Sequence, residues 1–239
     1  MKLSNRMTML CLPGLLLMLP MGVSAQWQNK PYTEWTEKEA LNILNNSPWA
    51  QTQEVADTTD MFNTSKKLDS NQTNRVAETA RVKFRIRLFS ARPIRQATTR
   101  LIEIKQKGKM NEQLAAQLRA LVDAGFSEYV VITLVVDTSE AGNQAGALAV
   151  VLDKQLTSEL KSETYLLAKG GARVFLQEYQ APRRDGFGAR FIFPRNVNGK
   201  PIINPDSRDL TFHTKLRDGP DFNMRFKVKD LALDGKLEY

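Results

Sequence analysis

The segment RVKFRIRLFSARPIRQATTRLIEIK, residues Arg81–Lys105, combines two periodicities within one short length of chain. In its first part apolar and charged side chains alternate, which is the period of a β-strand with one buried face. After Ser90 and Pro93 the apolar residues recur at helical spacing instead. The segment therefore predicts a half-buried strand that runs directly into an amphipathic helix. The apolar residues are Val82, Phe84, Ile86 and Leu88 in the strand, and Ile94, Ala97, Leu101 and Ile104 in the helix.

The charged face of this strand carries Lys83, Arg85 and Arg87, which a strand spaces about 6 to 7 Å apart. Arg92 and Arg95 follow at the start of the predicted helix. Such a group of cations can bind the phosphates or uronic acids of envelope polymers, because arginine binds oxyanions through paired hydrogen bonds. The alternative is a solvated outer face whose charges prevent sheet edges from aggregating. These five residues are the candidate anion-binding residues.

The first residues of the 239-residue chain are typical of an export signal. Lys2 and Arg6 precede or flank the start of an apolar run, Met7 to Leu19, and Val23-Ser24-Ala25 offers the small residues that a signal peptidase requires. The apolar run is shorter than the roughly 20 residues of a membrane span. We therefore expect a signal peptide over residues 1–25, cleavage after Ala25, a periplasmic or extracellular location, and no membrane span in the mature protein. An uncleaved anchor is the alternative.

Cysteine usage and charge restrict the class of protein. The only cysteine, Cys11, lies within the predicted signal peptide, so the mature protein cannot form a disulfide. This favours a bacterial periplasm or envelope over a eukaryotic secreted domain. The chain has 34 Lys and Arg against 26 Asp and Glu, and this positive excess favours anionic partners. Nucleic acid is not expected as a partner, because the protein is predicted to be exported and the cation cluster has no interleaved aromatic residues on the same face of the strand.

Residues 26–50 predict a small N-terminal helical segment. Thr36 and Glu39 have the spacing of a capping box, with Trp35 just before the cap. Pro48 helps to end the helix, and Trp49 follows it. Two tryptophan rings need an apolar environment. Either the helix docks on its own domain, or Trp35 and Trp49 bind a partner protein.

A polar linker is predicted over residues 51–80, where Ser, Thr, Asn, Asp and Gln dominate. It precedes a domain over residues 81–239. In that domain we expect a second helix, Asn111 to Ala124, and a buried strand, Tyr129 to Val136. Ala147 to Leu160 fits either a helix or a strand.

The last third of the chain predicts β-strands separated by turns. Asn198-Gly199 suits a tight hairpin, and Asp218 to Asp221 a slightly longer one. We therefore expect an α+β fold with a mainly antiparallel β body, for which a sandwich is one arrangement. Two or three helices would be inserted into it. The predicted strands of this third are Arg173–Tyr179, Ala189–Phe193, Leu210–Leu216 and Asn223–Val228.

No pattern in the sequence predicts a catalytic, metal or cofactor site. His213 is the only histidine, so a zinc site would depend almost entirely on carboxylates. Asp137-Thr138-Ser139 is similar to the Asp-x-Ser-x-Ser metal loop of adhesion-type von Willebrand A domains, but Ala141 stands where the second serine would be a ligand. We therefore expect no metal, no cofactor and no catalytic residue.

Two hypotheses for function remain open. The first is an exported, non-enzymatic envelope or secreted protein that binds another protein or an anionic envelope component. It depends on the absence of a catalytic motif. The second is a hydrolase that acts on envelope glycans or peptides with carboxylates of the β-rich third. Such carboxylates are Asp206, Asp209 and Asp230.

Several short motifs, taken together, resemble those of a group of uncharacterised bacterial secreted proteins. The resemblance would extend over nearly the whole mature chain. It implies export and a common fold, but it implies no activity and no functional residues. The motifs are Trp35-Thr36-Glu37-Lys38-Glu39-Ala40, Ser47-Pro48-Trp49-Ala50, Ser90-Ala91-Arg92-Pro93-Ile94-Arg95, Phe191-Ile192-Phe193-Pro194-Arg195 and Gly235-Lys236-Leu237-Glu238-Tyr239.

Overall fold

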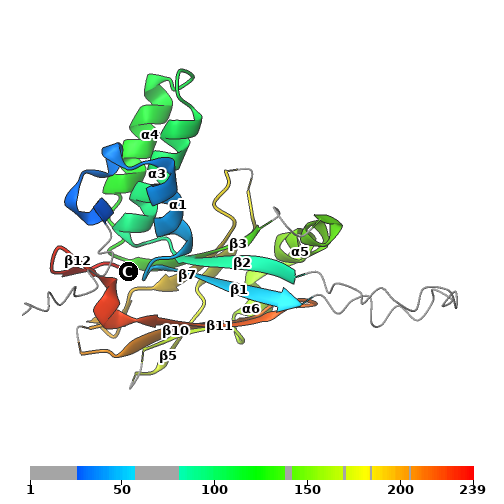
Figure 1. Ribbon diagram of the computed structural model, residues 1–239. Coiled ribbons are helices and arrows are strands. Elements are labelled where there is room, and N and C mark those ends of the chain that lie inside the picture. The colour runs from blue at the N-terminus through cyan, green and yellow to red at the C-terminus, as the bar shows by residue number, and fades with distance from the viewer. Residues whose placement is uncertain (1–25, 57–80, 138–141, 169–170, 184, 205) are drawn as a thin grey trace, which may run out of the picture.

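The computed structural model describes residues 26–56, 81–137, 142–168, 171–183, 185–204 and 206–239. Two antiparallel sheets lie face to face in this part of the chain, and a group of helices covers the outer side of the larger sheet (Figure 1). The predicted α+β fold with an antiparallel β body is therefore confirmed, and the body is a sandwich.

The larger sheet has the strand order β1-β2-β3-β7-β6, and each neighbouring pair is antiparallel. Its β2 covers Arg81–Leu88, and the alternation of this strand holds as predicted. Phe84 and Ile86 are fully buried, whereas Arg85 and Arg87 on the opposite face are partly exposed. The strands are β1 (Ala50–Ala56), β2 (Arg81–Leu88), β3 (Tyr129–Asp137), β7 (Ala189–Pro194) and β6 (Glu178–Gln180).

The smaller sheet has the strand order β11-β10-β4-β5. Phenylalanine rings join it to the larger sheet. The ring of Phe84 lies edge to face with that of Phe222, with centroids 4.9 Å apart, and Phe191 meets Phe212 at 5.2 Å. The hydrophobic core therefore lies between the two sheets. The strands are β11 (Asp221–Lys227), β10 (Asp209–Lys215), β4 (Tyr165–Ala168) and β5 (Arg173–Phe175).

Strand β1 corrects the predicted linker, which was expected to begin at Gln51. Residues 51–56 instead belong to a strand that pairs with β2 along its whole length. Gln53 donates a hydrogen bond to the Asp221 carbonyl of β11 at 3.0 Å, and Gln51 donates one to the Arg225 carbonyl. The strand is polar because it forms an edge, where its side chains bridge the two sheets. Residues 57–80 of the predicted linker lie outside the described residues.

A second correction concerns Arg173–Tyr179, which was predicted as one strand. The chain changes sheets in the middle of it. The Leu176 amide donates to the Thr164 carbonyl beside β4, and the next amide, that of Gln177, donates to Ile192 in β7, both at 2.9 Å. An alternating pattern does not show such a crossing, because the apolar side chains face the same core before and after it.

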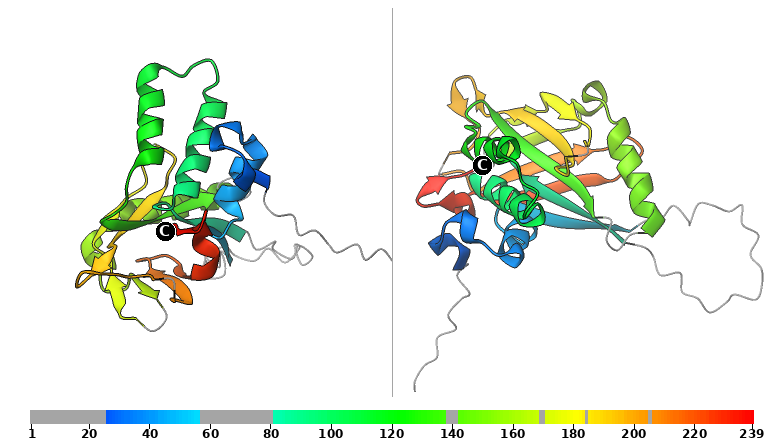
Figure 2. Two further views of the ribbon diagram at one scale, coloured as in Figure 1. Left: turned by 90° about the vertical axis from the view of Figure 1, so that its left-hand side faces the viewer. Right: turned by 90° about the horizontal axis from the view of Figure 1, so that it is seen from above.

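The helices on the larger sheet are α1 (Glu37–Asn45), α3 (Arg92–Lys105) and α4 (Glu112–Asp123). Figure 2 shows α3 and α4 standing on the sheet as a hairpin that projects from the body. The segment 147–160, left open by the sequence, is helical in α5 (Gly142–Lys154) and α6 (Thr157–Leu160). Four described helices are thus inserted between strands, rather than the two or three expected. None of the helices in the described part of the chain is long and apolar enough to cross a membrane.

Two local predictions are confirmed, one by side-chain hydrogen bonds and one by backbone geometry. The capping box is present, because Glu39 N donates to Thr36 Oγ1 at 3.3 Å and the Thr36 amide donates to the Glu39 carboxylate at 2.8 Å. Asn198 and Gly199 form a hairpin turn with φ of 51° and 74°. The remaining short elements are η1 (Gln26–Asn29), η2 (Tyr32–Glu34), β8 (Asn196–Val197), β9 (Lys200–Pro201), η3 (Val228–Leu231), β12 (Ala232–Leu233) and β13 (Lys236–Leu237).

Candidate anion-binding cavity

The two candidate tryptophans lie in the interior. Trp35 and Trp49 are 3% and 1% exposed, and both flank α1 beside Trp27. The Trp35 indole donates to the Trp27 carbonyl at 2.9 Å, and the Trp49 indole donates to the Glu238 carbonyl at 2.9 Å. The helical segment is therefore docked on its own domain. Neither ring is available to a partner protein in this conformation, so the partner-binding interpretation of these residues is not supported.

The five candidate cations separate into two groups. Arg85 and Arg87 line a cavity on the outer face of the larger sheet, whereas Arg92 and Arg95 line another cavity near the end of the chain. Lys83 lines neither. The sequence places these residues close together, but the chain reverses direction between β2 and α3. The single cluster of cations predicted from the sequence is therefore divided between two cavities.

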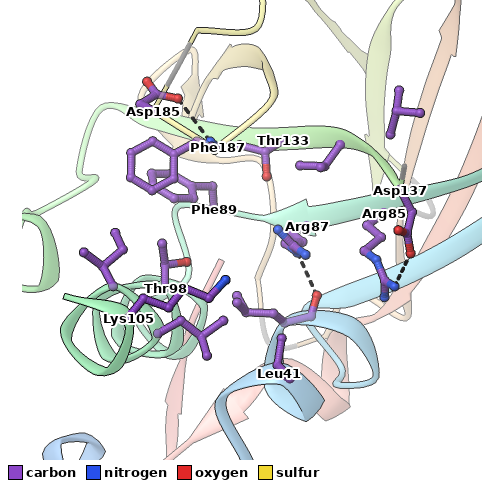
Figure 3. Close-up of a pocket in the computed structure, with 16 residues that line it drawn as sticks. Leu41, Arg85, Arg87, Phe89, Thr98, Lys105, Thr133, Asp137, Asp185 and Phe187 are labelled. Atoms are coloured by element: carbon purple, nitrogen blue, oxygen red, sulfur yellow. Dashed lines mark hydrogen bonds and ion pairs between the residues drawn. The ribbon is translucent and has the colours of Figure 1, made fainter. Parts of the chain in front are cut away.

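We call the first of these the strand-face cavity. It has a volume of about 350 Å³ and lies between β2, β3, the helices α1 and α3, and residues 185–187 before β7 (Figure 3). Its polar lining comprises Arg85, Arg87, Thr98, Lys105, Thr133, Asp137 and Asp185. Its apolar lining comprises Leu41, Leu44, Phe89, Leu101, Ile102, Val135, Val136 and Phe187.

Arg87 is the central cation of this cavity. Its Nε donates to the Leu44 carbonyl at 2.7 Å and its Nη2 donates to Asn45 Oδ1 at 3.0 Å, both in the last turn of α1. Burial lowers the pKa of Arg87 to about 10, and the like charge of Arg85 adds to this, while Asp137 opposes it. No carboxylate among the described residues forms an ion pair with Arg87. Its charge is met by neutral acceptors at the negative end of a helix.

Arg85 differs from Arg87, because its guanidinium forms an ion pair with the carboxylate of Asp137 at the end of β3. Asp137 is the first residue of the segment whose sequence is similar to a metal-binding loop. Thr138, Ser139 and Ala141 lie outside the described residues. Within the described residues, no group of three or more His, Cys, Asp or Glu side chains could hold a metal ion.

Asp185 fixes the segment that forms the far wall of the cavity. Its carboxylate pairs with Arg190 and accepts a hydrogen bond from the Phe187 amide at 3.1 Å. Burial raises the pKa of Asp185, but the hydrogen bonds from Arg190 and Phe187 outweigh burial and leave that pKa below its usual value. Asp185 is therefore ionised at neutral pH, and its negative charge is compensated by Arg190, five residues along the chain.

Gly188 determines how closely this segment approaches the sheet. Its φ is +78°, and a Cβ there would lie 2.4 Å from the Leu134 carbonyl oxygen. Only glycine fits this approach without a shift in the backbone. The approach brings the ring of Phe187 to 5.2 Å from that of Phe89, which builds an apolar wall opposite the cations.

Lys105 completes the polar lining from the end of α3. Figure 3 shows it extending from the helix toward the space below Arg87. It is exposed, and no described carboxylate forms an ion pair with it. Both carboxylates of the cavity, Asp137 and Asp185, are already paired with arginines. The cavity therefore has two uncompensated cations, Arg87 and Lys105, beside an apolar wall.

Sequence reasoning identified Arg85 and Arg87 but missed the other parts of this cavity. Asn45 and Lys105 were not singled out, because nothing local to them indicates a site. Phe187 lies between the predicted strands Arg173–Tyr179 and Ala189–Phe193, where only a turn was expected. Its position between two glycines, Gly186 and Gly188, was the one available signal of a tightly constrained loop.

The carboxylates suggested for hydrolysis do not line this cavity. Asp206 is exposed in the connection before β10, Asp209 opens β10, and Asp230 lies in η3. His213 lies on the outer face of the smaller sheet, where its ring stacks on Tyr165 with centroids 4.8 Å apart. The described structure therefore offers no specific observation in favour of the hydrolase.

Comparisons with known proteins do not extend these findings, since no protein-family model, curated protein or solved structure matches the chain.

Proposed function

We propose that this protein is an exported, non-enzymatic binding protein, and that its strand-face cavity binds the anionic group of an envelope component. The observation that carries the proposal is the state of Arg87. This side chain is partly buried, yet the described hydrogen-bond partners of its guanidinium are neutral. The signal-like start of the chain and its resemblance to bacterial secreted proteins support the exported location.

The chemistry of Arg87 favours an oxyanion as the ligand. A guanidinium has five N–H donors, and the contacts to Leu44 and Asn45 use two of them. An oxyanion in the cavity would accept hydrogen bonds from the remaining donors and offset the cost of burying the charge. Hydrogen bonds that involve a charged group contribute roughly 1.5 to 3 kcal/mol each.

The apolar wall indicates that the ligand also has an apolar part. Phe89, Phe187 and Ile102 line the cavity. The two cations without an ion pair to a described carboxylate, Arg87 and Lys105, line it with them. A volume of about 350 Å³ is at the small end of the range for ligand pockets. We therefore propose an amphiphilic anion, in which a carboxylate or phosphate is attached to an acyl or aromatic group.

Displacement of a fluorescent probe tests this proposal. The probe is 8-anilinonaphthalene-1-sulfonate, which combines a sulfonate with an aromatic group, and the competitors are decanoate and decyltrimethylammonium. We expect decanoate to displace the probe and the cation of equal chain length not to displace it. Lys105→Gln should weaken decanoate binding about tenfold, which corresponds to loss of about 1.4 kcal/mol.

Two variants control this experiment. Lys161→Gln removes an exposed charge outside the cavity and should bind like the wild type. Arg87→Met, checked for folding by circular dichroism, should abolish displacement by decanoate. Equal displacement by the anion and the cation, or wild-type binding by both cavity variants, would refute the proposal.

A further inference from the structure

A second cavity, which we call the tail cavity, lies on the other side of the start of α3. It has a volume of about 440 Å³ and shares no lining residue with the strand-face cavity. It is enclosed by the start of α3, the end of α4 with residues 124–127, Arg195 after β7, and residues 236–239. Four cations line it together with two side-chain carboxylates: Arg92, Arg95, Arg195 and Lys236 with Asp123 and Glu238.

Arg95 is the most deeply buried of these cations, with an exposure of 5%. Its Nη2 donates to the Val122 carbonyl at 3.2 Å and its Nη1 donates to the Ser90 carbonyl. Its guanidinium also lies 4.8 Å from the centre of the Phe126 ring. These contacts hold the side chain rigidly, but they are all neutral. Arg95 Nε is buried and has no hydrogen-bond partner among the described residues.

Arg92 leaves a second donor unused in the same cavity. Its Nε is also buried without a hydrogen-bond partner, although it lies 3.6 Å from a Glu238 carboxylate oxygen. The other Glu238 oxygen accepts a hydrogen bond from the Arg92 amide at 3.2 Å, in the first turn of α3. Glu238 therefore compensates Arg92 and the helix terminus, and Asp234 forms a second, exposed ion pair with Arg92 at 3.4 Å.

The other two cations complete the lining. Arg195 Nη1 donates to the main-chain oxygen of Tyr239 at 2.5 Å, and its guanidinium lies 3.7 Å from the centre of the Tyr239 ring. Lys236 is exposed and has no ion pair with a described carboxylate. Burial lowers the pKa of Arg95. The charge of Glu238 acts in the opposite direction, and the positive charges of Arg92 and Arg195 lower that pKa further. The cavity thus has four cations against two side-chain carboxylates, and the main-chain oxygen of Tyr239 is already bonded to Arg195.

We propose that the tail cavity is an oxyanion site that binds a phosphate group through the unused Nε donors of Arg92 and Arg95 and through Lys236. Arginine and lysine both bind phosphate, and the oxygens of a phosphate group accept hydrogen bonds from several directions. Inorganic phosphate and a phosphate monoester present the same chemistry to such a site. The site is independent of the proposed function, because the strand-face cavity contributes none of its residues.

Isothermal titration with inorganic phosphate and with glycerol 1-phosphate tests this inference on the purified protein. Sodium chloride keeps the ionic strength constant, so that general screening does not contribute to the heat. We expect saturable binding of at least one of the two probes. Lys236→Gln should weaken this binding at least fivefold, and because Lys236 is exposed the variant should fold normally. Lys229→Gln, an exposed charge outside the cavity, should bind like the wild type.

The outcomes separate the two cavities and the two sources of phosphate. Tight binding of glycerol 1-phosphate alone would identify a monoester as the ligand, and binding of both would identify the phosphate group itself. Lys105→Gln should leave phosphate binding unchanged, since Lys105 lines the other cavity. The inference is wrong if neither probe binds, or if Lys236→Gln and the buried-site variant Arg95→Lys both bind phosphate like the wild type.

Discussion

The strand-face cavity and the tail cavity hold an arginine in the same way but surround it differently. Arg87 donates to Leu44 in the last turn of α1, and Arg95 donates to Val122 in the last turn of α4. The carbonyls at the end of a helix carry partial negative charge, so each helix orients a guanidinium without neutralising it. A helix terminus can thus fix a cation and still leave its charge available to a ligand.

The surroundings of the two arginines differ in polarity. An apolar wall held by Asp185 and Gly188 faces Arg87, whereas a carboxylate from the last residues of the chain, Glu238, lies close to Arg92 beside Arg95. This difference suits the first cavity to an amphiphilic anion and the second to a small, highly charged one. The variants below change one cavity at a time, so each tests whether the two are separate.

The largest effect is expected from Gly188→Ala, which changes the wall of the strand-face cavity. The new Cβ would meet the Leu134 carbonyl oxygen at 2.4 Å, at a φ of +78°. A left-handed backbone costs roughly 1 to 2 kcal/mol and overpacking costs roughly 1 to 3 kcal/mol, so we expect a loss of about 3 kcal/mol. Urea denaturation measures this loss.

Gly186→Ala is the matched control for that variant. Gly186 has a φ of +79°, but no atom lies within 4 Å of the position of its Cβ. It should lose only the backbone contribution, about 1 kcal/mol. Equal losses in the two variants would show that the close approach to β3 does not constrain the segment. Phosphate binding in the tail cavity should be unchanged in Gly186→Ala.

The next largest effect is expected from Glu238→Gln in the tail cavity. Glu238 is 9% exposed, accepts a hydrogen bond from the Arg92 amide and compensates its guanidinium. Loss of the charge leaves Arg92 with only the exposed Asp234 carboxylate as an ion-pair partner, and we expect about 2 kcal/mol of destabilisation in urea denaturation. Asp234→Asn also removes an ion pair of Arg92, but that carboxylate is 73% exposed. It should cost less than about 0.5 kcal/mol.

A smaller effect on stability is expected from Arg87→Met, together with a large effect on binding. Met retains much of the apolar stem and removes a charge that is costly to bury. The Leu44 carbonyl and the side-chain oxygen Oδ1 of Asn45 then lose their hydrogen-bond donor, which costs about 1 kcal/mol overall. Thermal denaturation should show this small loss while decanoate binding disappears. A loss above about 3 kcal/mol would show that Arg87 is mainly structural.

The sequence was sufficient for the elements that local patterns determine. The alternation in Arg81–Leu88 and the helical spacing after Pro93 both describe the structure correctly, because one face of each element packs on a core. The capping box at Thr36 and the Asn198-Gly199 turn were predictable for the same reason, since each depends on residues within four positions of one another.

The sequence was insufficient wherever distant segments determine the environment. Strand β1 is polar because it is an edge whose glutamines bridge to β11, and composition alone cannot distinguish this from a linker. The row of cations on β2 was predicted to face solvent or a partner, whereas Arg87 turns to the end of α1. The two cavities depend on contacts of Arg92 with Glu238 and of Phe89 with Phe187, which lie 146 and 98 positions apart.

The smallest effect is expected from Glu39→Gln, which acts on the strand-face cavity through the start of α1. Hydrogen bonds from Lys30 and from the amide and hydroxyl of Thr36 lower the pKa of Glu39 to about 2. Because the folded pKa lies below the unfolded value of about 4.3, the stabilisation is present above that pH and is lost as the pH falls toward 2. Solvent screens this partly exposed pair, so we expect only about 1 kcal/mol at pH 7.

Urea denaturation of the wild type and Glu39→Gln at several pH values measures this contribution. The difference between them should be constant from pH 7 to pH 5, shrink through pH 4 and 3, and disappear near pH 2. Since α1 also provides the acceptors for Arg87, decanoate binding should weaken slightly in the variant while phosphate binding stays unchanged. Equal weakening of both ligands would mean that α1 supports the whole fold, and that the two cavities are not independent.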